Sequence, residues 1–104
     1  MAVTPEKKVK DKARKVLDEL GAYYFFPATH GYGRSGVPDI IGCYRGWFFA
    51  VECKAGKGKT TALQERELRL IRQSGGLAVV INEDNVGELK QMLEEWRDEV
   101  RRGK

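Results

Sequence analysis

The chain has 104 residues, of which 41% are hydrophobic and 33% charged, a balance typical of a single soluble globular domain over residues 1–104. No apolar run approaches the roughly 20 residues that a membrane-spanning helix needs, and the N-terminus lacks the apolar core of a signal peptide, so we expect a cytoplasmic protein. The net charge of +4, with basic clusters in residues 7–15, 54–59 and 97–104, favours a polyanionic partner without identifying one, because charge runs also form solvated helix faces.

Residues 5–20 have the pattern of a helix. Thr4 suits the N-cap, Pro5 the first turn and Gly21 the position just past the end. An apolar stripe runs along the helix at the expected spacing through Val9, Ala13, Val16, Leu17 and Leu20. Glu6 lies in the first turn, where a carboxylate complements the helix dipole, and the residues alone favour that structural role.

An aromatic-rich segment, residues 22–27, predicts a strand, and the glycine-containing segment 28–36 predicts a loop. The loop ends three residues before Asp39. A glycine loop that offers Arg34, Ser35 and backbone N–H groups can hold a phosphate, although an ordinary connection is the alternative. Because the loop leads directly to a carboxylate, we expect it to contact a phosphate.

Residues 36–54 predict a β-hairpin that turns at Arg45 and Gly46. A two-residue turn pairs Tyr44 with Trp47. A bulged three-residue loop is the alternative, since arginine is unfavourable at a turn position with positive φ, and it shifts the pairing by one residue.

In the two-residue register Asp39 lies opposite Glu52, and Lys54 shares their face because side chains alternate along a strand. Two carboxylates held this close repel each other, and burying them is costly without compensation. A divalent cation between them supplies that compensation. The sequence therefore predicts a metal site at one end of the hairpin, unless a slipped register separates the carboxylates.

Both faces of the hairpin are apolar, which predicts a sheet covered by helices on both sides. One face carries Ile40, Tyr44, Trp47, Phe49, Val51 and Cys53, and the other carries Val37, Ile41, Cys43, Phe48 and Ala50. Cys43 and Cys53 thus lie on opposite faces, so we expect two buried small hydrophobic residues and no disulfide. Two cysteines and the single histidine, His30, do not make a zinc site.

After the hairpin, the basic loop 55–59 offers Lys57 and Lys59 as phosphate contacts, with a merely solvated loop as the alternative. A helix over residues 61–74 follows, and its Thr61–Gln64 pair fits a capping box, which is compatible with an active-site role for Gln64. A buried strand over 77–82 and a helix from about 85 to 101 complete an α-β-β-β-α-β-α order. The side chains expected to point inward are Leu63, Leu68, Leu70 and Ile71 in the first of these helices, and Val86, Leu89, Met92, Leu93, Trp96 and Val100 in the second.

An ordered set of residues resembles the Pro-Asp…Glu-x-Lys signature of the PD-(D/E)XK nuclease superfamily, and more closely the VRR-NUC family, whose small stand-alone members occur in phages and bacteria. The residues that carry the resemblance are the stretch 33–39, Glu52, Lys54 and Gln64. It extends over residues 6–82. It implies an α/β fold with a restriction-endonuclease-like αβββαβ core and a mixed sheet, to which this chain adds a C-terminal helix.

The resemblance implies a Mg²⁺-dependent endonuclease acting on DNA, in which Mn²⁺ can substitute. The implied metal ligands are Asp39, Glu52, the backbone carbonyl of Cys53 and Glu6. Such hard oxygen ligands suit Mg²⁺. Lys54 would orient or help deprotonate the attacking water and stabilise the transition state, and Gln64 would position that water or Lys54.

Small members of the family resemble Holliday-junction resolvases in working as homodimers, so the expected substrate is branched DNA and the expected setting is a prokaryotic or phage-infected cell. No membrane partner and no small-molecule cofactor are expected. Two alternatives stay open: a non-catalytic nucleic-acid-binding module on the same fold, and a flap or restriction-type nuclease.

Overall fold

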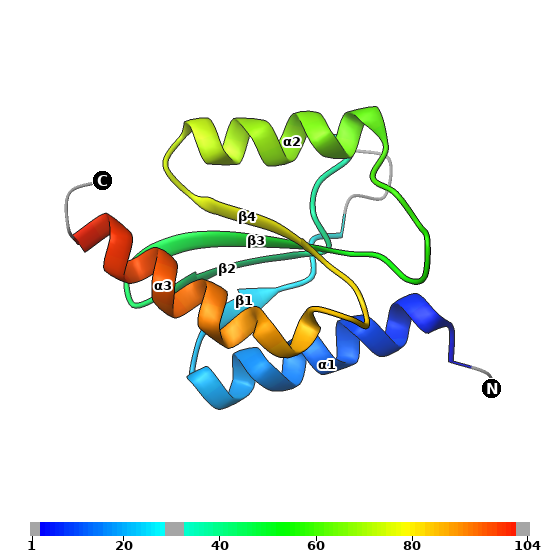
Figure 1. Cartoon of the computed structure of the whole chain (residues 1–104). Coiled ribbons are helices and arrows are strands. Elements are labelled where there is room, and N and C mark those ends of the chain that lie inside the picture. The colour runs from blue at the N-terminus through cyan, green and yellow to red at the C-terminus, as the bar shows by residue number, and fades with distance from the viewer. Residues whose placement is uncertain (1–2, 29–32, 102–104) are drawn as a thin grey trace.

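A computed structural model describes residues 3–28 and 33–101, with Val100 and Arg101 described in backbone only. Its elements in chain order are α1 (Pro5–Leu20), β1 (Tyr23–Phe25), β2 (Ile40–Tyr44), β3 (Trp47–Cys53), α2 (Ala62–Gln73), β4 (Leu77–Ile81), the 3₁₀ turn η1 (Val86–Glu88) and α3 (Leu89–Arg101). The predicted order is confirmed, except that the last helix begins with a 3₁₀ turn (Figure 1). Thr29 to Tyr32, including His30, lie outside the described residues.

Local signals determine both ends of α1 as the sequence predicts. The side-chain hydroxyl of Thr4 accepts a hydrogen bond from the Lys7 backbone N–H at 3.1 Å, which caps the first turn. Gly21 ends the helix with φ of 72°, a left-handed conformation that glycine adopts without steric cost.

The four strands form one mixed sheet in the order β1-β2-β3-β4. The first three strands pair antiparallel, and β4 pairs parallel to β3. The predicted mixed sheet is therefore confirmed. β4 is an edge strand and buries only Ala78 and Ile81 completely, so the prediction of a fully buried strand is wrong for its other residues.

The hairpin between β2 and β3 adopts the two-residue register. Tyr44 lies opposite Trp47, and the pairing continues without a bulge to Ile40 opposite Val51. Arg45 adopts φ of 51°, and this unfavourable position is accepted at the tip of the turn. Asp39 lies one residue before β2, so the ladder ends just short of the predicted Asp39–Glu52 pair.

Helices cover both faces of the sheet, with α1 and α3 on one side and α2 on the other (Figure 1). The larger core cluster includes Val9, Leu17, Ile40, Phe49, Val51, Ile81, Leu89 and Leu93. The smaller cluster joins Ala50, Leu68 and Ala78, with Ile71 packed against it. The predicted two-sided covering is confirmed. None of the helices in the described ranges is long and apolar enough to cross a bilayer.

Three predictions of burial are wrong. Leu63 and Leu70 are 46% and 38% exposed, because α2 packs on the sheet through a narrower stripe that contains Leu68. Cys43 is also exposed, while Cys53 is buried, and both are free thiols as expected.

Candidate active site

The predicted catalytic residues converge at one end of the sheet. Glu52 is the penultimate residue of β3 and Lys54 follows the strand directly, while Asp39 immediately precedes β2. Both α1 and α2 begin at this same end of the molecule (Figure 1). Helix N-termini attract anions, so the arrangement favours the approach of a phosphate.

Asp39 is held in place from two sides. Its Oδ2 accepts a hydrogen bond from the backbone N–H of Cys53 at 2.8 Å, at the point where β2 no longer extends to pair with β3. Its Oδ1 lies 3.4 Å from Nζ of Lys10 on α1. The carboxylate therefore takes the place of a strand neighbour and is fixed beside the end of β3.

Glu52 is only partly satisfied by its neighbours. Its Oε2 accepts a hydrogen bond from Gln64 Nε2 at 3.0 Å and lies 3.4 Å from Lys54 Nζ. Its Oε1 is buried and has no hydrogen-bond partner among the described residues. Since the residue is 2% exposed, this oxygen has lost its contacts with water and no hydrogen bond replaces them.

Burial dominates the proton affinities at this site. It raises the pKa of Glu52 from 4.5 to about 7, and repulsion by Asp39 adds to the effect, while Lys54 opposes it. Burial also raises the pKa of the Cys53 thiol to about 12, so the thiol stays protonated at neutral pH. At Cys53 the backbone carbonyl is therefore the better ligand for a hard cation.

Gln64 serves the helix cap and the site with different atoms of one amide. Its side-chain Oε1 accepts a hydrogen bond from the Thr61 backbone N–H at 2.9 Å, and the Gln64 backbone N–H donates to the Thr61 hydroxyl at 3.2 Å. The capping box thereby directs the NH₂ group toward Glu52. Gly36, with φ of 77°, lets the preceding loop approach this turn, because a Cβ there would lie 2.6 Å from the Leu63 backbone.

Sequence reasoning did not single out Lys10. Its Nζ lies 3.4 Å from Asp39 Oδ1 and 3.7 Å from Glu6 Oε2, so it links the first helix to the hairpin. The spacing of Glu6 and Lys10, four residues apart on one helix, was a signal for their pairing. The approach of Asp39 to the same ammonium depends on tertiary structure alone.

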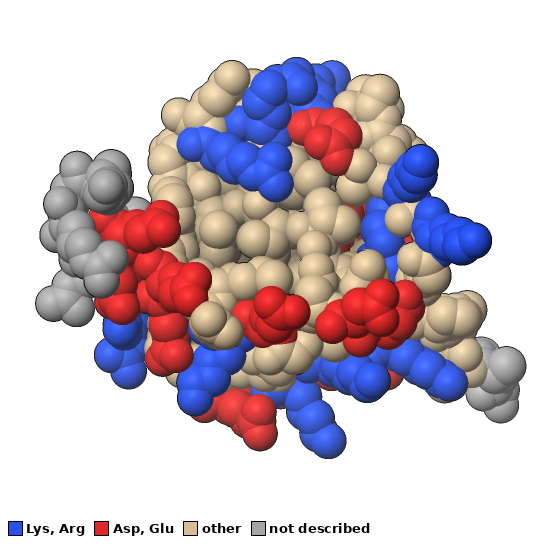
Figure 2. Space-filling view, in the orientation of Figure 1, with Lys and Arg blue, Asp and Glu red and all other residues tan. Residues whose placement is uncertain are grey.

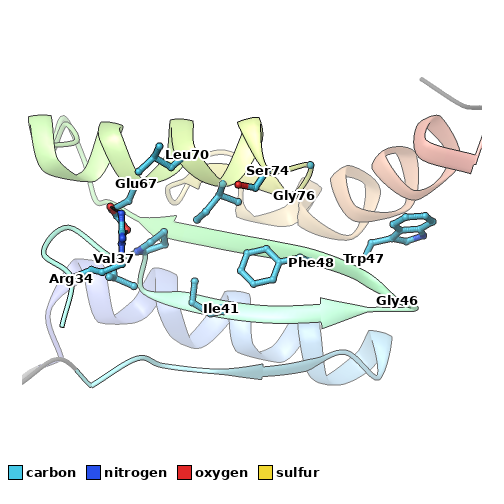
Figure 3. A pocket seen from close by; sticks show the side chains of 13 residues that line it. Arg34, Val37, Ile41, Gly46, Trp47, Phe48, Glu67, Leu70, Ser74 and Gly76 are labelled. Carbon is cyan, nitrogen blue, oxygen red and sulfur yellow. Dashed lines mark hydrogen bonds and ion pairs between the residues drawn. The ribbon is translucent and has the colours of Figure 1, made fainter.

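Arg34 and Ser35, predicted to contact DNA, are tied to α2. Arg34 donates from Nε and Nη2 to the two carboxylate oxygens of Glu67, at 2.8 and 2.7 Å, and Figure 3 shows the two side chains pointing toward each other. The Ser35 carbonyl accepts a hydrogen bond from Arg66 at 3.4 Å. Lys57 and Lys59 are exposed in the loop after β3.

Two hollows flank this region and differ in character. A hollow of about 380 Å³ adjoins the site and is lined by residues including Lys10, Arg34, Ser35, Asp39 and Gln64. A more apolar groove of about 800 Å³ lies between α2 and the hairpin and is lined by residues including Ile41, Phe48 and Leu70 (Figure 3). Asp39 and Gln64 line the smaller hollow and not the groove, whereas Glu52 lines neither of the two, so the smaller hollow is the one that adjoins the candidate site.

The donor atoms present fit one hard divalent cation. Within residues 3–28 and 33–101, no three His, Cys, Asp or Glu side chains gather as a metal-binding group. The candidate donors are instead two side chains, from Asp39 and Glu52, and the Cys53 carbonyl. The unpaired Oε1 of Glu52 is the observation that favours a cation, because a buried anionic oxygen needs a positive partner.

Of three comparisons with known proteins, the comparison with solved structures found a match. No protein-family model matches the sequence, and no curated protein does so either. A solved structure described as a VRR_NUC domain matches with a TM-score of 0.70 and 28% identity, over 86% of this chain and 97% of that chain. This match supports membership of the VRR-NUC family. The predicted α/β nuclease fold is thereby confirmed.

The charge of the chain is unevenly distributed over its surface. Figure 2 shows Lys and Arg side chains over α2 and on the side of the loop that follows β3, and a row of Asp and Glu side chains along α3. The acidic residues of α3 are Glu94, Glu95, Asp98 and Glu99, and the basic residues of α2 are Arg66, Arg69 and Arg72. A polyanion is therefore attracted to the end and upper side of the sheet and repelled by α3.

Proposed function

We propose that this VRR-NUC domain is a metal-dependent DNA endonuclease that hydrolyses phosphodiester bonds. The observation that carries the proposal is the buried, unpaired Oε1 of Glu52, in a nuclease fold, beside a second carboxylate and a lysine. DNA binding alone gives no reason to bury an incompletely paired negative charge next to the expected position of a phosphate.

Mg²⁺ is the proposed cofactor, and Mn²⁺ is expected to substitute for it. Asp39, Glu52 and the Cys53 carbonyl would hold the ion, whereas Glu6, the further ligand that the resemblance implies, is paired with Lys10 at 3.7 Å. When bound, the ion supplies Lewis-acid polarisation of a phosphate oxygen and lowers the pKa of a water molecule.

The residues around the cation have separate tasks. Lys54, whose side chain is 15% exposed, is held 3.4 Å from Glu52 Oε2, so its ammonium is positioned to orient the attacking water and to stabilise charge that develops on the phosphate. Gln64 fixes the Glu52 carboxylate by its hydrogen bond. Both tasks depend on side chains that the fold already holds in place.

The proposed DNA path crosses the end of the sheet. Lys57 and Lys59 lie in the loop next to Lys54, and the hollow lined by Arg34 and Ser35 adjoins Asp39. The acidic surface of α3 limits the approach from the other side. Binding is therefore expected to weaken steeply with salt, as it does when lysine and arginine contact phosphates.

Branched DNA, including Holliday junctions, is the proposed substrate class, and a homodimer the proposed assembly. Both follow from the resemblance to small VRR-NUC members. Exposed apolar side chains offer a surface that a second copy could cover, namely Tyr23, Phe25 and Phe48, which are 71%, 46% and 46% exposed. Light scattering during gel filtration tests the assembly, and a monomeric mass at micromolar concentration contradicts it.

The decisive experiment is cleavage of labelled four-way, flap and linear duplex DNA with and without Mg²⁺. We expect product only with the metal, and most from the four-way junction. Lys54→Ala should bind DNA and metal but lose cleavage by roughly 10²–10³-fold. Lys90→Ala is the matched control, because it makes the same substitution at an exposed position of α3, and it should cleave as the natural chain does.

Other results of the same experiment favour the alternatives. Binding without cleavage under every metal condition supports a nucleic-acid-binding module. Preferred cleavage of flap or linear DNA supports a flap or restriction-type nuclease on this fold.

A further inference from the structure

Lys10 joins two acidic side chains that come from different parts of the chain. Its ammonium lies 3.7 Å from Glu6 Oε2 and 3.4 Å from Asp39 Oδ1. The Lys10 side chain is 31% exposed and that of Asp39 is 21% exposed, so both are largely withdrawn from water. A positive charge thus already lies between two of the carboxylates that the resemblance assigns to metal binding.

A neighbouring pair on the same helix shows what an ordinary surface ion pair is like here. Lys7 and Asp11 are also four residues apart, at 3.2 Å, but their side chains are 60% and 49% exposed. Such pairs contribute little to stability and depend on no other element. Lys10 differs because its second partner, Asp39, comes from the hairpin and also bonds the Cys53 backbone.

The balance of charge limits how many cations the site accepts. With all three carboxylates ionised, Glu6, Asp39 and Glu52 contribute three negative charges and Lys10 and Lys54 two positive ones, so one net negative charge remains. One divalent cation reverses this sign and prepares the site for phosphate. A second divalent cation between Glu6 and Asp39 would have to displace the Lys10 ammonium and would meet its repulsion.

We propose that Lys10 takes the place of a second divalent cation between Glu6 and Asp39, so that each chain binds one divalent cation, on the side of Glu52. This inference rests on the proposed metal-dependent function. Lys10 is in this sense a positioning residue: its fixed charge holds Asp39 and replaces a charge that a second metal ion would otherwise bring.

The test counts Mn²⁺ ions bound per chain, without DNA, from the electron paramagnetic resonance signal of free Mn²⁺. We expect one ion for the natural chain, two for Lys10→Met and one for the matched control Lys7→Met. The double variant Lys10→Met with Glu6→Gln should return to one ion, because the vacated position has lost a ligand. Lys10→Gln, with circular dichroism to check folding, replaces Lys10→Met if that variant does not fold.

The outcomes separate this inference from the proposed function. Two ions bound to the natural chain, or one ion bound to a folded Lys10→Met, overturn the role of Lys10 and leave metal dependence intact. Absence of Mn²⁺ binding by the natural chain, with Glu52→Gln behaving identically, overturns the proposed metal dependence and this inference with it.

Discussion

Glu52 and Glu67 are both buried, at 2% and 5% exposure, but their surroundings differ. Arg34 satisfies both oxygens of Glu67, and Arg66 lies 3.3 Å from one of them. These arginines hold the pKa of Glu67 below its ordinary value. Glu52 has one satisfied oxygen and one without a partner among the described residues, and its pKa is raised to about 7.

Under the proposed function, this difference separates a structural carboxylate, Glu67, from a carboxylate that binds a cation, Glu52. A buried carboxylate that is fully paired fixes two elements together, in this case the loop before β2 and α2. A buried carboxylate that is only half paired lowers stability unless a further cation binds. The chain thus pairs Glu67 fully with its own arginines and leaves one oxygen of Glu52 without a partner among the described residues, where the proposed function would place a cation.

The largest effect that tests this contrast is on cleavage. Glu52→Gln should lower metal-dependent cleavage by roughly 10³-fold, because it removes the charge that holds the cation. Glu67→Gln is an equal change at similar burial and should leave cleavage per folded molecule nearly unchanged. Single-turnover cleavage of labelled DNA measures both. An equal loss of cleavage in the two variants contradicts the difference drawn between Glu52 and Glu67.

The pH dependence of stability in metal-free buffer should have opposite signs at the two carboxylates. Because folding raises the pKa of Glu52, its contribution is lost as pH rises from about 4.5 through about 7, by an amount on the order of 2–3 kcal/mol. Because folding lowers the pKa of Glu67, its contribution is present at neutral pH and is lost as pH falls through that lowered value.

Urea unfolding between pH 4 and 8 with a chelator measures this pair of trends. Glu52→Gln should be more stable than the natural chain at pH 8, since Asp39 then repels no second charge and Lys54 keeps a hydrogen-bond acceptor. Glu67→Gln should be less stable than the natural chain at neutral pH. Its free energy of unfolding should lack the part that the natural chain loses as Glu67 becomes protonated in acid. A destabilised Glu52→Gln at pH 8 contradicts the incomplete pairing of Glu52.

A smaller effect separates the two tasks of Gln64. Gln64→Ala removes the side-chain half of the capping box and the hydrogen bond to Glu52, and we expect about tenfold slower cleavage together with a loss of stability. Thr61→Ala removes the cap alone and should cost about 1 kcal/mol with cleavage nearly unchanged. Equal cleavage by the two variants would assign Gln64 to the cap only.

The smallest effect concerns Arg34. If it contacts phosphate while bonded to Glu67, Arg34→Ala weakens DNA binding a few-fold and lowers the salt slope by about one. Glu67→Ala frees the guanidinium without removing its charge and should leave the slope unchanged. DNA affinities measured at several salt concentrations compare the two variants. If both variants have the same salt slope, Arg34 only pairs with Glu67 and does not contact DNA.

The sequence by itself determined the elements and the local part of the site. The helix caps at Thr4 and Thr61 and the two-residue turn at Arg45 depend on near neighbours, so their signals are legible in the chain. The placement of Glu52 and Lys54 at one end of the hairpin was predictable for the same reason, because strand periodicity and turn length fix which side chains share a face.

Tertiary structure alone decided which distant side chains pair with each buried carboxylate, and which carboxylate oxygens are left without a partner. Lys10 meets Asp39, and Arg34 meets Glu67, across separations that no periodicity encodes. For the same reason the exposure of Leu63 was missed. A pattern tells which face of an element is apolar, but the packing of another element decides how much of that face is covered and which polar atoms find partners.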